Sequence, residues 1–234
     1  MKKILSIVLA TSLAAGFTAM SVGQDSQTQD SKAQDSKTQD SAPQDARPPR
    51  PARNGGKGEA AAGAKIGEAA PAFTLKTTDG KDWSLADAKG KVVVLEWVNP
   101  DCPVCQRVMT DGTVAASIKG CKDQFADVVY IAVNSSASSK SSLDATAAYL
   151  KDNKIDVPAL LDSDGKVGKL FGARTTPHCF VIDAKGVLVY KGAINDSQTG
   201  DGKINYVVQA VSQLKKGESV SPSETKPFGC AVKY

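Results

Sequence analysis

The amino-acid sequence predicts an α/β sandwich with a central mixed β-sheet. Short runs of β-branched and other apolar residues alternate with segments whose apolar residues recur at helical spacing. The first elements follow the order strand, helix, strand, helix, which is typical of parallel strands joined by crossover helices. Two later strands are separated only by residues 184–186 (AKG), and this short connection predicts an antiparallel hairpin. The expected sheet therefore contains both kinds of pairing.

The expected elements run from residue 73 to residue 217. The segment 92–97 (VVVLEW) is apolar almost throughout, which is typical of a strand buried on both faces. Further strands are expected at 73–76, 128–133, 158–161, 179–183 and 187–190. Helices are expected from residue 103 to near Gly120 and at 141–153, 166–171 and 204–214, with the last one ending at Gly217.

Residues 1–23 have the form of a secretory signal peptide. A basic start, Lys2 and Lys3, precedes an apolar run over 4–20 that gives way to a polar tract. The run is short and rich in Ala, Ser and Thr, so we expect cleavage near residues 19–23 in preference to a membrane anchor. The mature chain is therefore expected to be exported, to the periplasm or another extracytoplasmic space, with no integral membrane segment after cleavage.

Residues 24–64 are expected to form a disordered linker. Five pentapeptides beginning with Gln-Asp fill 24–48, and a five-residue period fits neither a helix nor a strand. The folded domain is then expected over 65–218, followed by a tail over 219–234. The formal net charge of +4 falls to about +2 when Lys2 and Lys3 leave, and no basic surface for nucleic acid is indicated.

The five cysteines include one pair, Cys102 and Cys105, in C-x-x-C spacing. The pair lies where a buried strand leads into a helix, and Pro103 suits the first helical position. Cys102 would then be the N-cap, where the helix dipole favours its thiolate, and Cys105 would lie one turn behind. This geometry predicts that Cys102 is the nucleophile of a redox pair and that Cys105 resolves it.

Metal binding is the competing interpretation of this spacing. Structural zinc needs four ligands, and the chain has one histidine and no second C-x-x-C. A copper carrier is a remote alternative, because Cys102, Cys105 and His178 would make a soft site suited to Cu(I). We expect no metal and no cofactor.

Glu96 and Pro177 are further candidates. Glu96 lies six residues before Cys102 in an apolar strand, and a carboxyl group buried there would have a raised pKa and could exchange protons with Cys105. The alternative is that Glu96 points to solvent. A cis peptide bond before Pro177 would expose the backbone of Thr176 for pairing with an incoming peptide, whereas an ordinary trans bond would not.

Several segments of the domain carry a resemblance to a known family. They are IGEAAPAFTL (66–75), Asp79-Gly80, GKVVVL (90–95), the cysteine motif, Thr176-Pro177 and FVID (180–183). In this order they resemble the redoxin branch of the thioredoxin-like superfamily, which includes the alkyl hydroperoxide reductase/thiol-specific antioxidant (AhpC/TSA) proteins. The resemblance covers residues 65 to about 216. It implies a thioredoxin-like three-layer sandwich, with Thr176-Pro177 as the cis-proline motif and Glu96 as the buried acid of thioredoxins.

The sequence does not decide which cysteine resolves a disulfide formed at Cys102. The ending GCAVKY (229–234) resembles the tail of a bacterial redoxin subgroup, and this offers Cys230 as an alternative resolving thiol. A structural disulfide between Cys230 and Cys121, or a free tail thiol, are the other interpretations. Cys121 follows the expected end of a helix, where it can be exposed, whereas Cys179 is expected to be buried.

The function expected from these features is that of an exported thiol–disulfide oxidoreductase. Its partners would be protein disulfides or thiols and an electron-donor redox protein. A peroxiredoxin-like thiol peroxidase is the alternative, with Cys102 attacking a peroxide and Cys105 or Cys230 resolving. Peroxiredoxins carry Pro-x-x-x-Thr-x-x-Cys at this point, and the segment 99–102 (NPDC) does not supply that Thr.

Overall fold

The computed structural model describes residues 63–136 and 140–234. The expected signal peptide, 1–23, and the expected linker up to residue 62 lie outside the described residues. Ala64 is already part of the domain, because its side chain is buried and its N–H donates to the carbonyl oxygen of Leu170. Over the described residues, we find no helix with the length and apolar character needed to cross a membrane.

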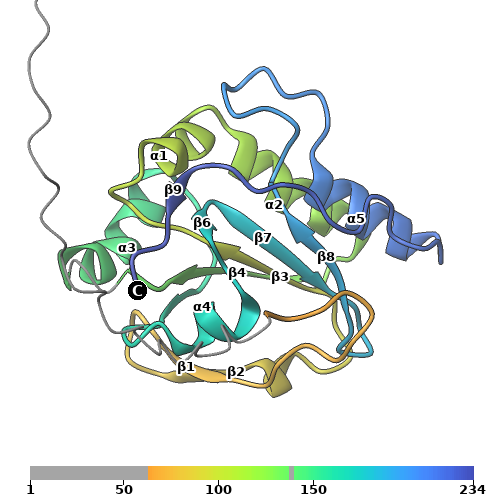
Figure 1. The fold of residues 1–234 in the computed structure, drawn as a ribbon, viewed down its shortest axis with the longest axis horizontal. Coiled ribbons are helices and arrows are strands. Elements are labelled where there is room, and N and C mark those ends of the chain that lie inside the picture. The colour runs from red at the N-terminus through yellow and green to blue at the C-terminus, as the bar shows by residue number, and fades with distance from the viewer. Residues whose placement is uncertain (1–62, 137–139) are drawn as a thin grey trace, which may run out of the picture. The chain divides into compact units, whose positions relative to one another are not determined.

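A seven-stranded mixed sheet lies at the centre of the fold (Figure 1). Its strand order is β2-β1-β5-β4-β3-β7-β8, with β3 parallel to β4 and antiparallel to β7. The strands are β1 Thr74–Thr77, β2 Asp82–Ser84, β3 Val93–Trp97, β4 Val129–Asn134, β5 Ala159–Leu161, β7 His178–Ile182 and β8 Leu188–Gly192. A separate two-stranded sheet pairs β6 (Thr175–Thr176) with β9 (Cys230–Ala231).

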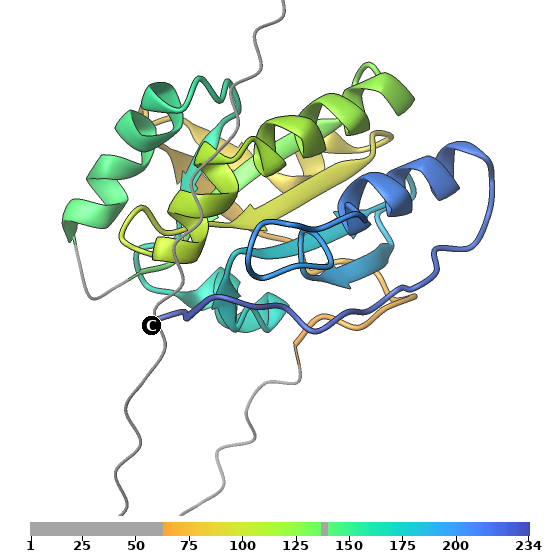
Figure 2. The same cartoon turned by 90° about the horizontal axis from the view of Figure 1, so that it is seen from above.

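Helices cover both faces of the sheet, and the fold is the predicted thioredoxin-like sandwich. The helices are α1 Pro103–Thr110, α2 Thr113–Gln124, α3 Lys140–Asp152, α4 Lys166–Phe171 and α5 Tyr206–Lys215, with a short 3-10 helix, η1, at Leu85–Ala88. Alternate side chains of β3 enter two different cores. Val94 packs in the core shared with α1, α2, α3 and α5, whereas Leu95 packs in the core shared with α4 and η1. Figure 2 shows α4 on the side of the sheet opposite α1 and α2.

The single helix predicted from residue 103 to near Gly120 is instead two helices. Gly112 has a left-handed backbone, with φ of 84°, and this turn separates α1 from α2. Gly120 does not end the helix, because α2 continues to Gln124. A β-carbon on Gly120 would lie 2.7 Å from Cγ2 of Val208 in α5, so the glycine serves close helix packing. Cys121 consequently lies inside α2 and is fully buried, contrary to the expected exposure.

A chain of buried hydrogen bonds links the end of β3 to the start of α4. The indole Nε1 of Trp97 donates to Oγ of Ser135 over 2.9 Å, and that hydroxyl donates to Asp162 over 2.6 Å. The Asp162 carboxylate also accepts the N–H of Gly168 over 2.8 Å. Buried polar groups that are satisfied in this way specify one arrangement. The network therefore fixes α4 beside the strand that leads to the cysteine pair.

Candidate active site

The structure places Cys102 and Cys105 as the sequence predicts. Cys102 is the N-cap of α1, and Pro103 follows at the first helical position. Both thiols are buried, each residue being 1% exposed. Cys102 is therefore closed to large molecules such as a folded protein in this arrangement.

The tail brings a third sulfur to the pair. Sγ of Cys230 lies 2.7 Å from Sγ of Cys102, and the carbonyl oxygen of Thr176 lies 3.1 Å from the same Cys102 sulfur. Cys230 reaches this place because β9 pairs with β6, where Thr176 is opposite Cys230. The Thr176–Pro177 peptide bond is cis. In Figure 1, β9 lies next to β6 and close to α1.

The three thiols differ strongly in acidity. The pKa of Cys102 is lowered from 9.0 to about 4, chiefly because the Cys105 thiol donates a hydrogen bond to its thiolate, while burial opposes the shift and Cys230 adds a second donor. The Cys102 side chain makes no capping hydrogen bond at the start of α1. The backbone N–H of Cys105 lowers the pKa of Cys102 less than either of the two thiols does. Burial raises the pKa of Cys230 to about 11 and that of Cys105 well above 9.0, and their contact with Cys102 acts in the same direction. At neutral pH the site therefore holds one thiolate between two thiols.

Glu96 is buried, so the alternative in which it points to solvent is wrong. Its residue exposure is 1%, and its Oε2 accepts a hydrogen bond of 2.7 Å from the hydroxyl of Tyr130. Burial raises the pKa of Glu96 to about 7, and the Tyr130 hydrogen bond opposes this shift. Oε1 of Glu96 has no hydrogen-bond partner among the described residues. Burial and Cys102 are the main causes of the raised pKa of Cys105, and the negative charge of Glu96 raises it further. The carboxyl group and the buried thiol therefore interact electrostatically.

His178 does not form a copper site with the cysteine pair. Its Nδ1 accepts the backbone N–H of Arg174 over 3.2 Å. Burial lowers the pKa of His178 to about 3, and the charges of Arg174 and Lys191 lower it further, so the ring is neutral. Within residues 63–136 and 140–234, no group of three or more His, Cys, Asp or Glu side chains is arranged to hold a metal ion. The structure thus lends no support to the copper alternative.

The remaining cysteines belong to the core. Cys121 and Cys179 are both fully buried, and burial raises the pKa of Cys121 to about 12. None of the five cysteines, all of which lie in the described part of the chain, forms a disulfide. A disulfide between Cys121 and Cys230 is contradicted, because Cys121 faces the core from α2 while Cys230 lies against Cys102.

Three tyrosines of the site were not anticipated from the sequence. Tyr130 binds Glu96 from the neighbouring strand, and Tyr234 binds the domain through the tail. The Tyr149 hydroxyl is buried without a hydrogen-bond partner in the described part of the chain. Burial raises the pKa of Tyr149, and the charges of Cys105 and Glu96 contribute to this rise. Only Tyr234 had a signal in the sequence, as the aromatic end of the tail motif.

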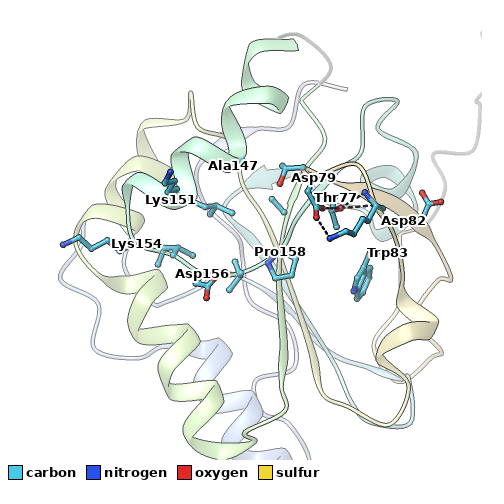
Figure 3. A pocket seen from close by; sticks show the side chains of 15 residues that line it. Thr77, Asp79, Asp82, Trp83, Ala147, Lys151, Lys154, Asp156 and Pro158 are labelled. Carbon is cyan, nitrogen blue, oxygen red and sulfur yellow. Dashed lines mark hydrogen bonds and ion pairs between the residues drawn. The ribbon is translucent and has the colours of Figure 1, made fainter.

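A cavity of about 680 Å³ lies away from the cysteines (Figure 3). It opens between the β1–β2 turn and the end of α3. Its lining includes Asp79, Asp82, Lys151 and Lys154, and Asp79 forms an ion pair with Lys81. Charges of both signs are thus mixed around the cavity, and no cysteine lines it.

The chain is similar to several known proteins in sequence and in fold. A model of the AhpC/TSA family matches residues 66–191. The thiol-disulfide oxidoreductase ResA of Bacillus subtilis is 29% identical over 137 residues, which cover 58% of this chain and 72% of ResA. The chloroplastic peroxiredoxin Q of Suaeda salsa is 31% identical over 156 residues, which cover 62% of this chain and 69% of that protein. The solved structure of a hypothetical protein from Sinorhizobium meliloti 1021 is 25% identical with a TM-score of 0.63, covering 73% of this chain and 94% of that one.

The first two of these relatives are named as a thiol-disulfide oxidoreductase and a peroxiredoxin, and the family match takes in more than half of the chain. It spans the strand β3, the cysteine pair and the cis-proline. The chain therefore belongs to the AhpC/TSA family.

Proposed function

We propose that the protein is an exported thiol–disulfide oxidoreductase in which Cys102 is the nucleophile and Cys105 the first resolving thiol. One observation carries the proposal: Cys102 begins helix α1, with Cys105 one turn behind and Sγ of Cys230 2.7 Å from its own sulfur. Two further thiols thus lie near a sulfur whose pKa is lowered. A low-pKa cysteine at a helix start is typical of thiol–disulfide exchange. Export rests on the signal-peptide pattern of residues 1–23.

The reaction consists of two sulfur exchanges. In the first, the Cys102 thiolate attacks one sulfur of a substrate disulfide, and the other sulfur leaves with the electron pair and takes a proton from solvent. A mixed disulfide between Cys102 and the substrate results. In the second, Cys105 loses its proton and attacks Sγ of Cys102, which releases the second substrate thiolate. The substrate disulfide has then been reduced to two thiols, and the Cys102–Cys105 pair has been oxidised; the reverse sequence oxidises a substrate dithiol.

Glu96 is the proposed acceptor of the Cys105 proton. A thiol whose pKa is raised well above 9.0 needs a base when it attacks, and solvent is excluded by burial. A carboxyl group with a pKa of about 7 can take a proton and later release it near neutral pH. The hydroxyl of Tyr130 holds this carboxyl group in place.

Turnover by cysteine variants tests the proposal. Reduction of a protein disulfide is measured with wild type, Cys102→Ser, Cys105→Ala, Cys230→Ala and the double variant lacking both Cys105 and Cys230. We expect Cys102→Ser to be inactive and the double variant to stop at the mixed disulfide. Cys121→Ala, which changes a core cysteine, is the control and is expected to keep turnover. Full activity in Cys102→Ser would contradict the assignment.

A thiol peroxidase is the second candidate function. The match to a peroxiredoxin and the near-complete burial of Cys102 favour it, because a peroxide is small enough to reach a sulfur that a folded protein cannot. Cys102 would be oxidised to a sulfenic acid, and Cys105 or Cys230 would displace water from it to form a disulfide. Stopped-flow oxidation of the reduced protein by hydrogen peroxide is the test. A rate no faster than that of free cysteine would exclude this function.

A further inference from the structure

Residues 223–228 fasten the start of the tail to the outer edge of the sheet. The N–H of Lys191 in β8 donates to the carbonyl oxygen of Ser223 over 3.1 Å, and the N–H of Thr225 donates to the carbonyl oxygen of Lys191 over 3.2 Å. Oγ1 of Thr225 lies 2.6 Å from the Tyr190 hydroxyl and accepts the N–H of Ala193 over 2.9 Å. Thr225 is thus anchored by backbone and side chain together.

Residues 229–234 then cross directly over the cysteine site. Gly229 has a φ of 122°, and a β-carbon there would lie 2.1 Å from the carbonyl oxygen of Thr176, so the crossing requires glycine. Cys230 is paired with Thr176, and Ala231 with the preceding residue of β6. The N–H of Val232 continues the ladder by donating to the carbonyl oxygen of Arg174 over 3.0 Å.

Tyr234 lies in a cradle formed by two glycines of the α4 region. A β-carbon on Gly165 would lie 2.5 Å from Cδ1 of the tyrosine ring, and one on Gly168 would lie 2.6 Å from Cε1. The Tyr234 hydroxyl donates to the carbonyl oxygen of Ala173 over 2.5 Å. The ammonium group of Lys169 lies 5.2 Å from the ring centroid, within the range of a cation–π contact. The space between the glycines, the hydrogen bond to Ala173 and the positive charge of Lys169 therefore all favour a phenolic ring at this place.

Residues 229–234 thus have the contacts of a bound peptide: strand pairing, a cysteine at the reacting sulfur and a side-chain anchor. We propose that residues 229–234 occupy a binding site for an extended polypeptide of another molecule. The cysteine of that polypeptide reacts with Cys102, and an aromatic residue four positions later enters the cradle of Gly165 and Gly168. This inference rests on the proposed function and names the substrate class of the same site.

Binding of the tail and of a substrate segment is mutually exclusive. The backbone edge of Thr175–Thr176 can pair with one strand at a time, and Cys102 is 1% exposed while the tail is bound. A substrate must therefore displace residues 229–234, while the anchor at Thr225 can stay in place. The exchange needs no added oxidant: the Cys102 thiolate attacks the peptide sulfur of the incoming disulfide, the other sulfur leaves with the electron pair, and a Cys102–peptide disulfide forms.

The test compares two peptide disulfides on the full chain. The hexapeptides Ac-Gly-Cys-Ala-Val-Lys-Tyr and Ac-Gly-Cys-Ala-Val-Lys-Ala are each joined through cysteine to thionitrobenzoate, whose coloured thiolate is the better leaving group. The second-order rate constant of its release is measured with wild type and with Tyr234→Ala, in which the cradle is vacant. Lys226→Ala, which changes an exposed residue of the tail, is the matched control.

In Tyr234→Ala we expect both peptides to react faster than with wild type, and the tyrosine peptide to react about tenfold faster than the alanine peptide. Adding Gly168→Ala to that variant should remove the preference, because the new methyl group fills the cradle. Lys226→Ala should behave as wild type. Equal rates for the two peptides in Tyr234→Ala, or no acceleration over wild type, would overturn the inference. A failure of the proposed function looks different: no protein, including Tyr234→Ala, would release thionitrobenzoate from either peptide, and both proposals would fall.

Discussion

At the scale of single residues, the charge on Cys102 depends on its sulfur neighbours. The helix start alone does not explain a pKa of about 4, because the thiol of Cys105 is the largest cause and that of Cys230 is a further one. Each thiol can donate only while it stays protonated, and burial keeps the pKa of both above the neutral range. The three groups therefore titrate as a unit in which one thiolate is preferred.

Replacement of Cys105 by alanine is expected to raise the pKa of Cys102. Thiolate absorbance near 240 nm in the reduced wild type should appear with a midpoint near pH 4. Cys105→Ala should move this midpoint upward, and further than Cys230→Ala, because the Cys105 thiol is the stronger donor. Cys121→Ala should leave it unchanged. A wild-type midpoint above pH 8 would contradict the account of the thiolate.

Glu96 should make the protein less stable as the pH rises. Its folded-state pKa of about 7 lies above its ordinary value of 4.5, so its contribution to stability is complete below pH 4.5 and is lost as the pH passes through 7. Between pH 5 and pH 8 the free energy of unfolding should fall by about 2–3 kcal/mol relative to Glu96→Gln, which can still accept the Tyr130 hydrogen bond.

Denaturant unfolding of the two reduced proteins at both pH values measures this difference. Because the pKa of Cys102 is lowered, its contribution to the free energy of unfolding changes with pH in the opposite direction. Both proteins contain Cys102, so this contribution cancels in the difference between them. A pH-independent difference between wild type and Glu96→Gln would show that the carboxyl group does not titrate in this range.

At the scale of elements, the strand β9 decides how exposed the reacting sulfur is. Gly229→Ala would place a methyl group against the Thr176 carbonyl, at a backbone conformation that alanine tolerates poorly. Strain of this kind costs on the order of 1–3 kcal/mol, so the tail should detach and alkylation of Cys102 should become roughly tenfold faster or more.

Iodoacetamide at pH 5 reports this detachment, since at that pH Cys102 is a thiolate while Cys105 and Cys230 remain protonated. Lys226→Ala serves as the control and should react like wild type. An unchanged rate in Gly229→Ala would mean that residues 229–234 do not cover the sulfur.

Some of these elements could be predicted from the sequence and others could not. The strand β3 and the start of α1 are encoded locally, by a β-branched run and by Pro103 after Cys102. The strands β6 and β9 have two residues each and exist only because they pair across the fold. The break between α1 and α2 was missed because Gly112 and Gly120 look alike in sequence, yet only Gly112 adopts a left-handed backbone.

At the scale of the whole molecule, the site is assembled from distant parts of the chain. β3 supplies Glu96, the α1 start supplies the cysteine pair, and the cis-proline segment supplies the edge on which Cys230 rests. The spacing of Cys102 and Cys105 could be read directly, whereas the contact of Cys102 with Cys230 depends on the route of the tail along β8. Similarly, Tyr130 is next to Glu96 only through the pairing of β3 with β4.

The role of Cys102 as the nucleophile is tested most directly by identifying the cysteine that carries the substrate. The variant lacking both Cys105 and Cys230 is mixed with a protein disulfide, quenched with acid and digested, and the linked peptides are identified by mass spectrometry. We expect a stable mixed disulfide between the substrate and Cys102. Linkage through Cys121 or Cys179, or no linked peptide while the substrate is still reduced, would contradict it.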